Sequence, residues 1–361
     1  MQLLADARTL LVFLVTFTVI IAVHEFGHYL TARLLGMRVL EFAFGFPPRL
    51  FALRKGGIEY SVNAIPFGGF VRILGQDDFA IRQQGEGEPG SFTSKPWWMQ
   101  AIVLVAGVAM NLILALVVLT ASFALGGTAP TGAVRVSEVK AASPAEAAGI
   151  RVDDVIREVD GRRITTSRDL VLYTREHRGV EIALAIDRNG RPLAAPVRAV
   201  PRTEPPEGEG PLGIVLEDVV APVSGGLPQA FANAVTLTVD IVRQIAALPA
   251  QLIAGSQASP DGAPEIGGPI EIYRITGQVS QFGLPALLRL IGVLSINLAI
   301  LNIIPFPALD GGRLLFVLIG GIFQRRLSPQ VEALVHAVGF VLLLGLLVLV
   351  SIADIRRAIG G

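Results

Sequence analysis

The feature that most constrains this chain is the pattern His24-Glu25-Phe26-Gly27-His28 within a long apolar segment. Ionisable side chains are costly at membrane depth, so two imidazoles and a carboxylate there indicate a chemical role. Residues four apart on a helix lie about 40° apart around its axis and roughly 6 Å apart along it, so both histidines can bind one metal ion. Glu25 is then a candidate general base acting on a water molecule.

The composition is typical of a membrane protein. Of 361 residues, 52% are hydrophobic and 17% are charged, with a mean hydropathy of +0.59, so we predict an integral membrane protein. The 30 basic and 30 acidic residues give a formal net charge of zero, which argues against nucleic acid as a partner. Because cysteine is absent, a zinc site must use His, Asp or Glu side chains.

Long apolar stretches predict a polytopic α-helical membrane protein with four membrane helices. These helices are expected within residues 1–35, 97–125, 283–323 and 324–361. Prolines and glycines interrupt the third stretch, so that crossing is expected to be unwound in its middle. The first stretch is interpreted as an uncleaved helix, because histidines and a glutamate occupy the place of a signal-peptide cleavage site.

Residues 36–96 are expected to form a membrane-associated β-hairpin and a polar loop on the cytoplasmic side. Strand-like runs at Val39–Phe44 and Ile58–Ile65 flank a Gly56-Gly57 turn, and many aromatic residues indicate that the hairpin dips into the membrane. Irregular backbone at that depth must be buried in protein or line a wet cavity. The alternative is an interfacial hairpin with no catalytic part.

Residues 126–204 differ in composition and predict a soluble α+β domain of short strands and helices. The stretch Ser143–Ile150, followed by Asp153–Ile156, resembles a PDZ domain of the bacterial type, with Asp153 where such domains usually have glycine. Residues 205–282 are interpreted as a linker and an amphipathic helix at 229–253. That helix lies on the membrane or packs on the domain.

A catalytic zinc usually takes three protein ligands, and few residues can supply the third. Asp310 is the only acidic residue in the broken third crossing, where an unpaired carboxylate is costly, so we expect it to be the ligand. The alternative is a structural Asp-Gly turn. His177 falls in the soluble domain and His336 begins the last helix, so neither is favoured. Asn111, in the second helix, is expected to hold a neighbouring helix rather than to face the site.

Two motifs together resemble the paired signature of the site-2 protease family of intramembrane zinc metalloproteases, above all the bacterial members that cleave anti-sigma factors. They are His24-Glu-Phe-Gly-His28 and Asn302-Ile-Ile-Pro-Phe-Pro-Ala-Leu-Asp310-Gly-Gly312. The resemblance covers nearly the whole chain. It implies His24, His28 and Asp310 as zinc ligands, Glu25 as the catalytic base and Asn302 as a residue that helps to hold the substrate.

The resemblance also implies a reaction. Zinc lowers the pKa of a bound water, and Glu25 takes the proton for hydrolysis of a peptide bond within the membrane. The implied substrate is a single-span membrane protein, either anti-sigma-factor-like or a remnant signal peptide, after a prior site-1 cut. The hairpin is expected to offer a strand edge to the unwound substrate, and the PDZ-like domain to filter substrates by size or to bind a peptide. Only one such domain is visible, which leaves the substrate open.

Two other classes of function are compatible with the residues alone. A membrane metal transporter would use the His and Asp side chains as an ion path, but it gives Glu25 no task. A non-catalytic membrane adaptor would use the PDZ-like domain for binding and zinc for structure. Substitution of Glu25 distinguishes both from a protease.

Basic residues in the short loops predict the orientation in a bacterial inner membrane. The first and third loops carry nine: Arg38, Arg49, Arg54, Lys55, Arg72, Arg82, Lys95, Arg325 and Arg326. The opposite side carries three: Arg8, Arg356 and Arg357. The positive-inside rule then places both termini and the PDZ-like domain outside the cytoplasm, with the metal site in the cytoplasmic half of the membrane.

Overall fold

The computed structural model describes residues 2–76, 87–206, 208–253, 268–323 and 328–360. The chain forms two compact units. The first, called the helical unit here, contains Met1–Leu125, Gly225–Leu248 and Glu265–Gly361. The second, called the sheet unit, is built mainly from Gly126–Ser224.

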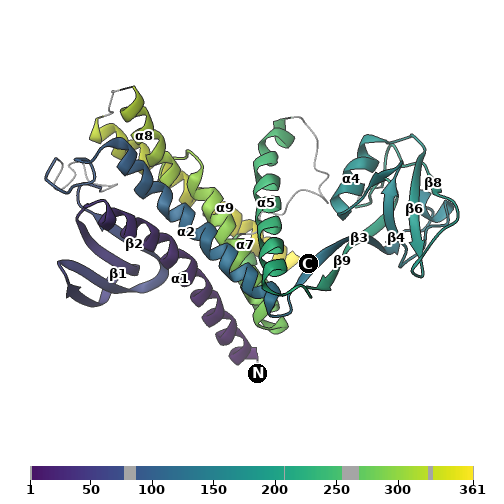
Figure 1. Ribbon diagram of the computed structural model, residues 1–361, viewed down its shortest axis with the longest axis horizontal. Coiled ribbons are helices and arrows are strands. Elements are labelled where there is room, and N and C mark those ends of the chain that lie inside the picture. Colours follow the sequence, from purple (N-terminus) through teal and green to yellow (C-terminus); the bar gives the residue numbers. More distant parts are fainter. Residues whose placement is uncertain (1, 77–86, 207, 254–267, 324–327, 361) are drawn as a thin grey trace. The chain divides into compact units, whose positions relative to one another are not determined.

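Among the described residues, four helices are long and apolar enough to cross a membrane, judged by length and composition. They are α1 (Gln2–Leu34), α2 (Trp97–Ala124), α7 (Leu284–Ile303) and α9 (Pro329–Gly360). α2 has a central place, because it contacts α1, α7 and the shorter α8 (Asp310–Ile322) (Figure 1). Many Leu and Val side chains of these helices are exposed, as expected for surfaces solvated by lipid. The helical unit also contains α5 (Gly226–Ile253), α6 (Pro269–Val279) and the short 3-10 helix η1 (Ser280–Phe282).

The third apolar stretch differs from the prediction of one crossing over 283–323 with an unwound middle. α7 alone has 20 residues, which is about 30 Å at 1.5 Å per residue, so the break follows a full-length helix. Pro305 and Pro307 lie in the break, where a missing backbone N–H costs no helical hydrogen bond. The chain resumes as α8 at Asp310. The break therefore presents Asp310 in the first turn of a helix.

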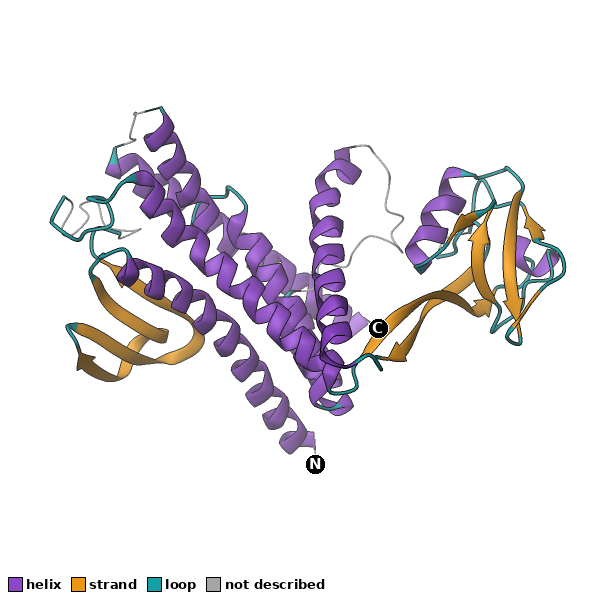
Figure 2. Cartoon of the chain, viewed as in Figure 1, coloured by secondary structure: helices purple, strands orange, loops and turns teal. Residues whose placement is uncertain are grey.

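Strands β1 (Val39–Lys55) and β2 (Ile58–Ile73) form a layer beside the C-terminal half of α1 (Figure 2). They are longer than the predicted runs, because the prolines and glycines taken as strand ends lie at bends and register shifts. Phe42 has register partners in both halves of β2, Val71 and Tyr60, so the first half of β1 lies between them. On α1, Tyr29 contacts this layer through a 2.8 Å hydrogen bond between its hydroxyl and that of Tyr60.

The C-terminal part of α9 is tied to the start of α6. The Asp354 carboxylate accepts hydrogen bonds from the backbone N–H groups of Gly268 at 3.2 Å and Glu271 at 3.1 Å. The first N–H groups of a helix have no partner within that helix, so a carboxylate there is stabilising. Arg357 also contacts Asp354, at 2.8 Å. A residue near the chain end thus caps a helix that begins more than eighty positions earlier.

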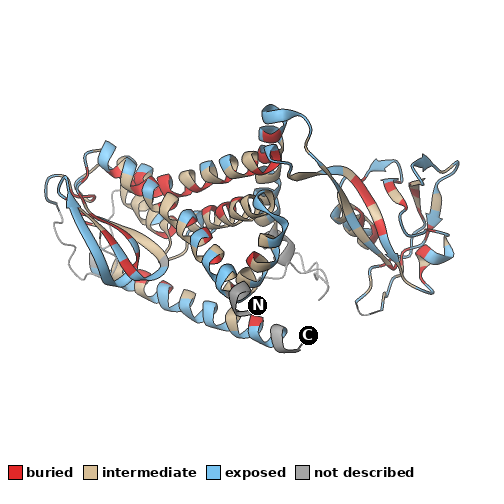
Figure 3. Cartoon of the chain, turned by 90° about the horizontal axis from the view of Figure 1, so that it is seen from below, coloured by how far each residue is buried: buried red, intermediate tan, exposed pale blue. Residues whose placement is uncertain are grey.

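The sheet unit holds a seven-stranded sheet with the strand order β7-β6-β4-β3-β9, in which β5 pairs with β4 and β8 with β6. Its strands are β3 (Thr128–Val139), β4 (Val155–Val159), β5 (Arg162–Arg163), β6 (Ile182–Arg188), β7 (Arg191–Pro192), β8 (Val197–Ala199) and β9 (Ile214–Pro222). Two helices, α3 (Pro144–Ala147) and α4 (Ser167–Glu176), complete it. Buried side chains such as Val134, Ile156 and Leu184 form one core (Figure 3).

The predicted end of this domain at residue 204 is too early. Strand β9 lies in the stretch interpreted as a linker, yet it pairs with β3 from Thr128↔Pro222 to Val139↔Ile214. Its strand pattern is weak for two reasons. It contains the charged residues Glu217 and Asp218, and its more buried face is only half-buried while the other face is exposed. The pairing places the first and last strands of the unit side by side. An insertion with adjacent ends disturbs its host chain little.

Candidate metal centre

Three side chains from two distant parts of the chain converge in the helical unit. His24 and His28 lie one turn apart on α1, and Asp310 begins α8. Asp310 Oδ2 lies 3.0 Å from His24 Nε2 and 3.3 Å from His28 Nε2. The two Nε2 atoms are 3.1 Å apart. Among the described residues, this is the one group of three or more His, Cys, Asp or Glu side chains arranged to hold a metal ion.

The donor set fits zinc. Two imidazole nitrogens and one carboxylate oxygen are zinc ligands of a usual catalytic type, with a fourth position left for water or substrate. Bonds of about 2.0–2.1 Å in a tetrahedral site hold ligand atoms about 3.3 Å apart. The observed separations of 3.0–3.3 Å match that geometry.

Contacts from α2 orient both imidazoles. The Nδ1–H of His28 donates to the backbone oxygen of Val103 at 2.8 Å, which leaves its Nε2 free to bind a metal. His24 Nδ1 lies 3.3 Å from the side-chain amide of Asn111, whose Oδ1 is buried without a partner. Rotating this amide by 180° places Oδ1 next to Nδ1, where it can accept from the His24 Nδ1–H. Asn111 therefore faces the site, and the expectation that it holds a neighbouring helix rather than facing the site is wrong.

Two glycines let α1 and α2 approach closely enough for these contacts. A Cβ at Gly27 would lie 2.4 Å from the backbone oxygen of Ala106. A Cβ at Gly107 would lie 2.4 Å from His28 Nε2 and 2.7 Å from His24 Cε1. Any side chain at Gly107 would therefore enter the space around the ligand atoms.

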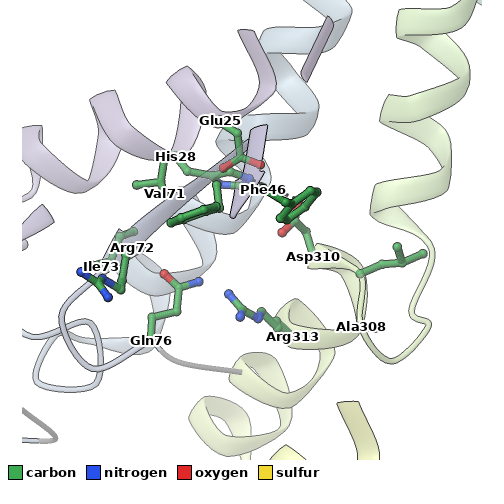
Figure 4. Close-up of a pocket in the computed structure, with 12 residues that line it drawn as sticks. Glu25, His28, Phe46, Val71, Arg72, Ile73, Gln76, Ala308, Asp310 and Arg313 are labelled. Carbon is green, nitrogen blue, oxygen red and sulfur yellow. Dashed lines mark ion pairs between the residues drawn. The ribbon is translucent and has the colours of Figure 1, made fainter. Parts of the chain in front are cut away.

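Glu25 opens onto a cavity of about 440 Å³ that also reaches His28 and Asp310. Figure 4 shows Glu25 and His28 on one side of this cavity and Asp310 and Arg313, both from α8, on the other. The end of β2 forms a further wall through Phe70, Val71, Arg72 and Ile73. Glu25 therefore lines the same cavity as two of the three converging side chains.

Of the remaining candidate residues, Asn302 lies beside the three converging side chains, whereas His177 and His336 do not. The side-chain nitrogen of Asn302 lies 3.4 Å from His24 Nε2, so Asn302 adjoins the three converging atoms. His177 lies in the sheet unit, where it stacks on Tyr173 at 4.0 Å between ring centroids. His336 is buried on α9 and hydrogen-bonds the backbone of Ala308, so it does not join the ligand group. As the sequence indicated, neither of these two histidines is with the converging residues.

The contacts that α2 makes with His24 and His28 were not predicted from the sequence. Gly107 and Asn111 lie four positions apart, so both occur on the face of α2 that meets α1. A small residue and an amide at that spacing within an apolar helix was a usable signal. The contact with Val103 has no such signal, because it uses a backbone oxygen.

Comparisons with known proteins agree with this geometry. The model of peptidase family M50 matches residues 12–346. A Clostridium perfringens protein that carries a zinc metalloprotease name is 33% identical over 343 residues, 95% of this chain and 97% of its own. The regulator of sigma-W protease RasP of Bacillus subtilis is 28% identical over 425 residues, 97% of this chain and 99% of its own. The zinc metalloprotease RasP of Oceanobacillus iheyensis is 29% identical with the same coverage.

Proposed function

Because this chain belongs to peptidase family M50, the membrane-embedded site-2 protease family of zinc metalloproteases, we propose that His24, His28 and Asp310 bind its zinc. We further propose that Glu25 is the general base. The observation that carries both assignments is the convergence of three ligand atoms within 3.3 Å of one another beside Glu25 and an accessible cavity. Family membership sets aside the transporter and adaptor alternatives.

Each residue then has a task in peptide hydrolysis. His24, His28 and Asp310 would hold a zinc ion, which when bound would lower the pKa of a water molecule and polarise a peptide carbonyl. The Glu25 carboxylate accepts the proton of the attacking water and delivers it to the leaving amine. Once His24 Nε2 is engaged as a ligand, the Asn302 side-chain N–H can donate to the substrate backbone, which supports a substrate-binding role.

The strand layer supports a way to hold an unwound substrate. Within the described residues, Gly69–Val71 of β2 pairs with β1 on one side only. Phe70 and Val71 of this segment line the cavity that contains Glu25 and Asp310. An extended peptide can add to such an edge through main-chain hydrogen bonds, which would place a scissile bond next to the ligands. Peptide bonds in an intact helix have engaged carbonyls, so unwinding must come first.

The proposed substrate is a single-span membrane protein that has already been shortened by a site-1 cut. An anti-sigma-factor-like substrate is favoured by the relatives named as RasP, one of which is a regulator of sigma-W protease. A remnant signal peptide is the alternative within the same class. The sheet unit, proposed to be PDZ-like, would act as a filter against large extracytoplasmic domains or as a peptide binder.

The proposed topology has four crossings, by α1, α2, α7 and α9, in a bacterial inner membrane. The count of basic residues in the loops supports a cytoplasmic strand layer and an extracytoplasmic sheet unit. This topology puts the ligand group in the cytoplasmic half of the membrane.

The deciding experiment is Glu25→Gln in the purified full-length protein, given a membrane-spanning peptide. We expect zinc to be retained and cleavage to fall by at least about 100-fold, because the amide cannot take a proton. Asp310→Asn is the matched comparison, and it should lose zinc as well as activity. Cleavage that survives Glu25→Gln would refute the assigned base.

A further inference from the structure

His336 is a buried polar residue that the proposed reaction does not use. It lies on α9 with 2% of its surface exposed. Its Nδ1 accepts a hydrogen bond from the backbone N–H of Ala308 at 2.8 Å. Ala308 is two residues before Asp310, on the connection that leads into α8 (Figure 4). One side chain of the last helix thus contacts the segment that presents the third ligand.

This segment needs external support. Ala308 has φ 75°, in the left-handed region that a residue with a Cβ enters only when its surroundings hold it there. The next residue, Leu309, is extended and provides no side-chain cap for α8. The conformation of these two residues decides where the Asp310 carboxylate points. Nδ1 of His336 accepts the hydrogen bond that stabilises Ala308, the first of these two residues.

A second contact of α9 reinforces the first. Gly339 lies one turn after His336, on the same face of the helix. A Cβ at Gly339 would lie 2.4 Å from Pro307 Cβ and 2.6 Å from its backbone oxygen, so α9 is pressed against this segment. On another side, Phe316 of α8 meets the imidazole edge-on, with 5.5 Å between ring centroids. The imidazole is therefore held between α8 and the segment before it.

The tautomer of His336 that this hydrogen bond requires is informative about the role of Nδ1 as an acceptor. An accepting Nδ1 requires the proton on Nε2, yet Nε2 is buried and has no partner among the described residues. A buried N–H without a partner is unfavourable, and an apolar side chain of similar shape would avoid it. Nδ1 therefore offers the Ala308 N–H an acceptor that an apolar side chain of similar shape would lack.

We infer that His336 is a positioning residue: its Nδ1 holds Ala308 in the left-handed conformation and thereby keeps the Asp310 carboxylate at the metal centre. This inference rests on the proposed assignment of Asp310 as a zinc ligand. It gives His336 no contact with zinc or with substrate.

The test compares two substitutions in the full-length purified protein. In His336→Asn, the side-chain oxygen can take the place of Nδ1, whereas His336→Phe keeps a ring but has no acceptor. We expect His336→Phe to weaken zinc binding, measured by competition with a chelator, by about 10- to 100-fold, and to lower kcat/KM for a membrane-spanning peptide in parallel. His336→Asn should keep both zinc binding and kcat/KM near the values of the unmodified protein. Val338→Phe, at a position 52% exposed on the same helix, is the control for a phenylalanine introduced into α9.

A space-filling role predicts the opposite order, with Phe tolerated and Asn harmful, and that result would overturn the inference. If His336→Phe does not fold, His336→Leu provides a second variant without an acceptor. Normal zinc affinity in His336→Leu would equally overturn it. Asp310→Asn separates the two proposals. Zinc retained in Asp310→Asn refutes the ligand assignment itself, whereas zinc lost there but kept in His336→Phe and His336→Leu refutes only the role of His336.

Discussion

At the level of single residues, the space beside the two imidazoles depends on Gly107 of α2. The ligand atoms of His24 and His28 can approach Asp310 only because no side chain projects from α2 at this point. The same face of α2 supplies the Val103 backbone oxygen and the Asn111 amide, which orient the two rings. One helix that supplies none of the three converging side chains thus orients two of them.

We predict that Gly107→Ala weakens zinc binding and cleavage, each on the order of 100-fold, as disturbed support of metal ligands does. The physical reason is steric, because the added methyl group would lie 2.4 Å from His28 Nε2. Gly345→Ala on α9 is the matched control, since nothing lies within 4 Å of its Cβ position. Chelator competition and peptide cleavage measure both effects. Equal behaviour of the two variants would show that α2 does not shape the site.

At the level of secondary-structure elements, the layer formed by β1 and β2 has two edges that pair with no further strand among the described residues. These two edges lie at different places. The segment Gly69–Val71 borders the cavity, whereas the segment around Leu53 pairs inward with Tyr60 and contributes nothing to the cavity lining. A substrate strand bound at the metal centre can use only the first of these two edges. The distinction can be tested by cross-linking because the natural chain has no cysteine.

We predict that Phe70→Cys, introduced into the Glu25→Gln protein, forms a disulfide with single cysteines placed in the scissile segment of the substrate. Directly opposite residues in paired strands have Cβ atoms about 4.5–5.5 Å apart, close to what a disulfide requires. Efficiency should peak at substrate positions two residues apart, because alternate side chains share one face. Leu53→Cys is the control. Cross-linking through Leu53 that equals or exceeds cross-linking through Phe70 would contradict binding at the β2 edge.

A partly buried ion pair links the residue before β4 to the end of β6 in the sheet unit. Arg188, at the end of β6, donates from Nε and Nη2 to the two Asp154 carboxylate oxygens, both at 2.7 Å. Burial by itself would raise the pKa of Asp154, but the hydrogen bonds from Arg188 and from the Arg151 backbone N–H lower it below its usual value. A carboxyl whose pKa is lower in the folded than in the unfolded state stabilises the fold above its unfolded pKa of about 3.9 and loses this contribution as pH falls.

We predict that hydrogen-exchange protection of β4 and β6, corrected for intrinsic rates, decreases as pH falls below about 4. Asp154→Asn should reduce this pH dependence and lower the stability of the sheet unit by about 3 kcal/mol at neutral pH, because Arg188 loses its charge partner. The amides of α2 serve as the internal reference. An unchanged pH dependence in the variant would assign the effect to other carboxylates.

At the level of the whole molecule, the sheet unit is an insertion whose ends meet. The backbone N–H of Val223 donates to the backbone oxygen of Gly127 at 3.2 Å, and Thr128 is the register partner of Pro222. This pairing defines a clean excision. Deleting residues 126–204, the domain bounds expected from the sequence, would remove β3 and leave β9 without its partner strand.

We predict that joining Gly127 to Val223 through a short flexible linker yields a folded protein that cleaves substrates still carrying their extracytoplasmic domain. A size filter requires this gain, because its removal admits the larger substrate. Retention of zinc and cleavage of a pre-trimmed peptide are the controls for folding. Loss of cleavage of the pre-trimmed peptide, with zinc retained, would instead identify the sheet unit as a required peptide binder.

The sequence alone located the long helices and the converging residues. Membrane-length apolar runs, the i, i+4 histidines and a carboxylate in an apolar segment are local signals, because helix geometry and the cost of buried charge act on neighbouring residues. They located α1, α2, α9 and the group of His24, His28 and Asp310, and the structure brings that group together. Asn302, implied by the family resemblance, lies beside it.

Only the tertiary structure decided which surfaces meet. Gly107, the Val103 oxygen, Asn111 and His336 matter through contacts between elements far apart in the sequence. Such contacts leave no periodic pattern in the sequence. Strand β9 was missed for a similar reason, since its residues are held by pairing with β3 rather than by a strong pattern of their own. The H-E-x-x-H pattern indicated a metal site here; the packing of α2, α8 and α9 around it supplied the space, the orientation and the third converging side chain, because these depend on distances that sequence spacing does not contain.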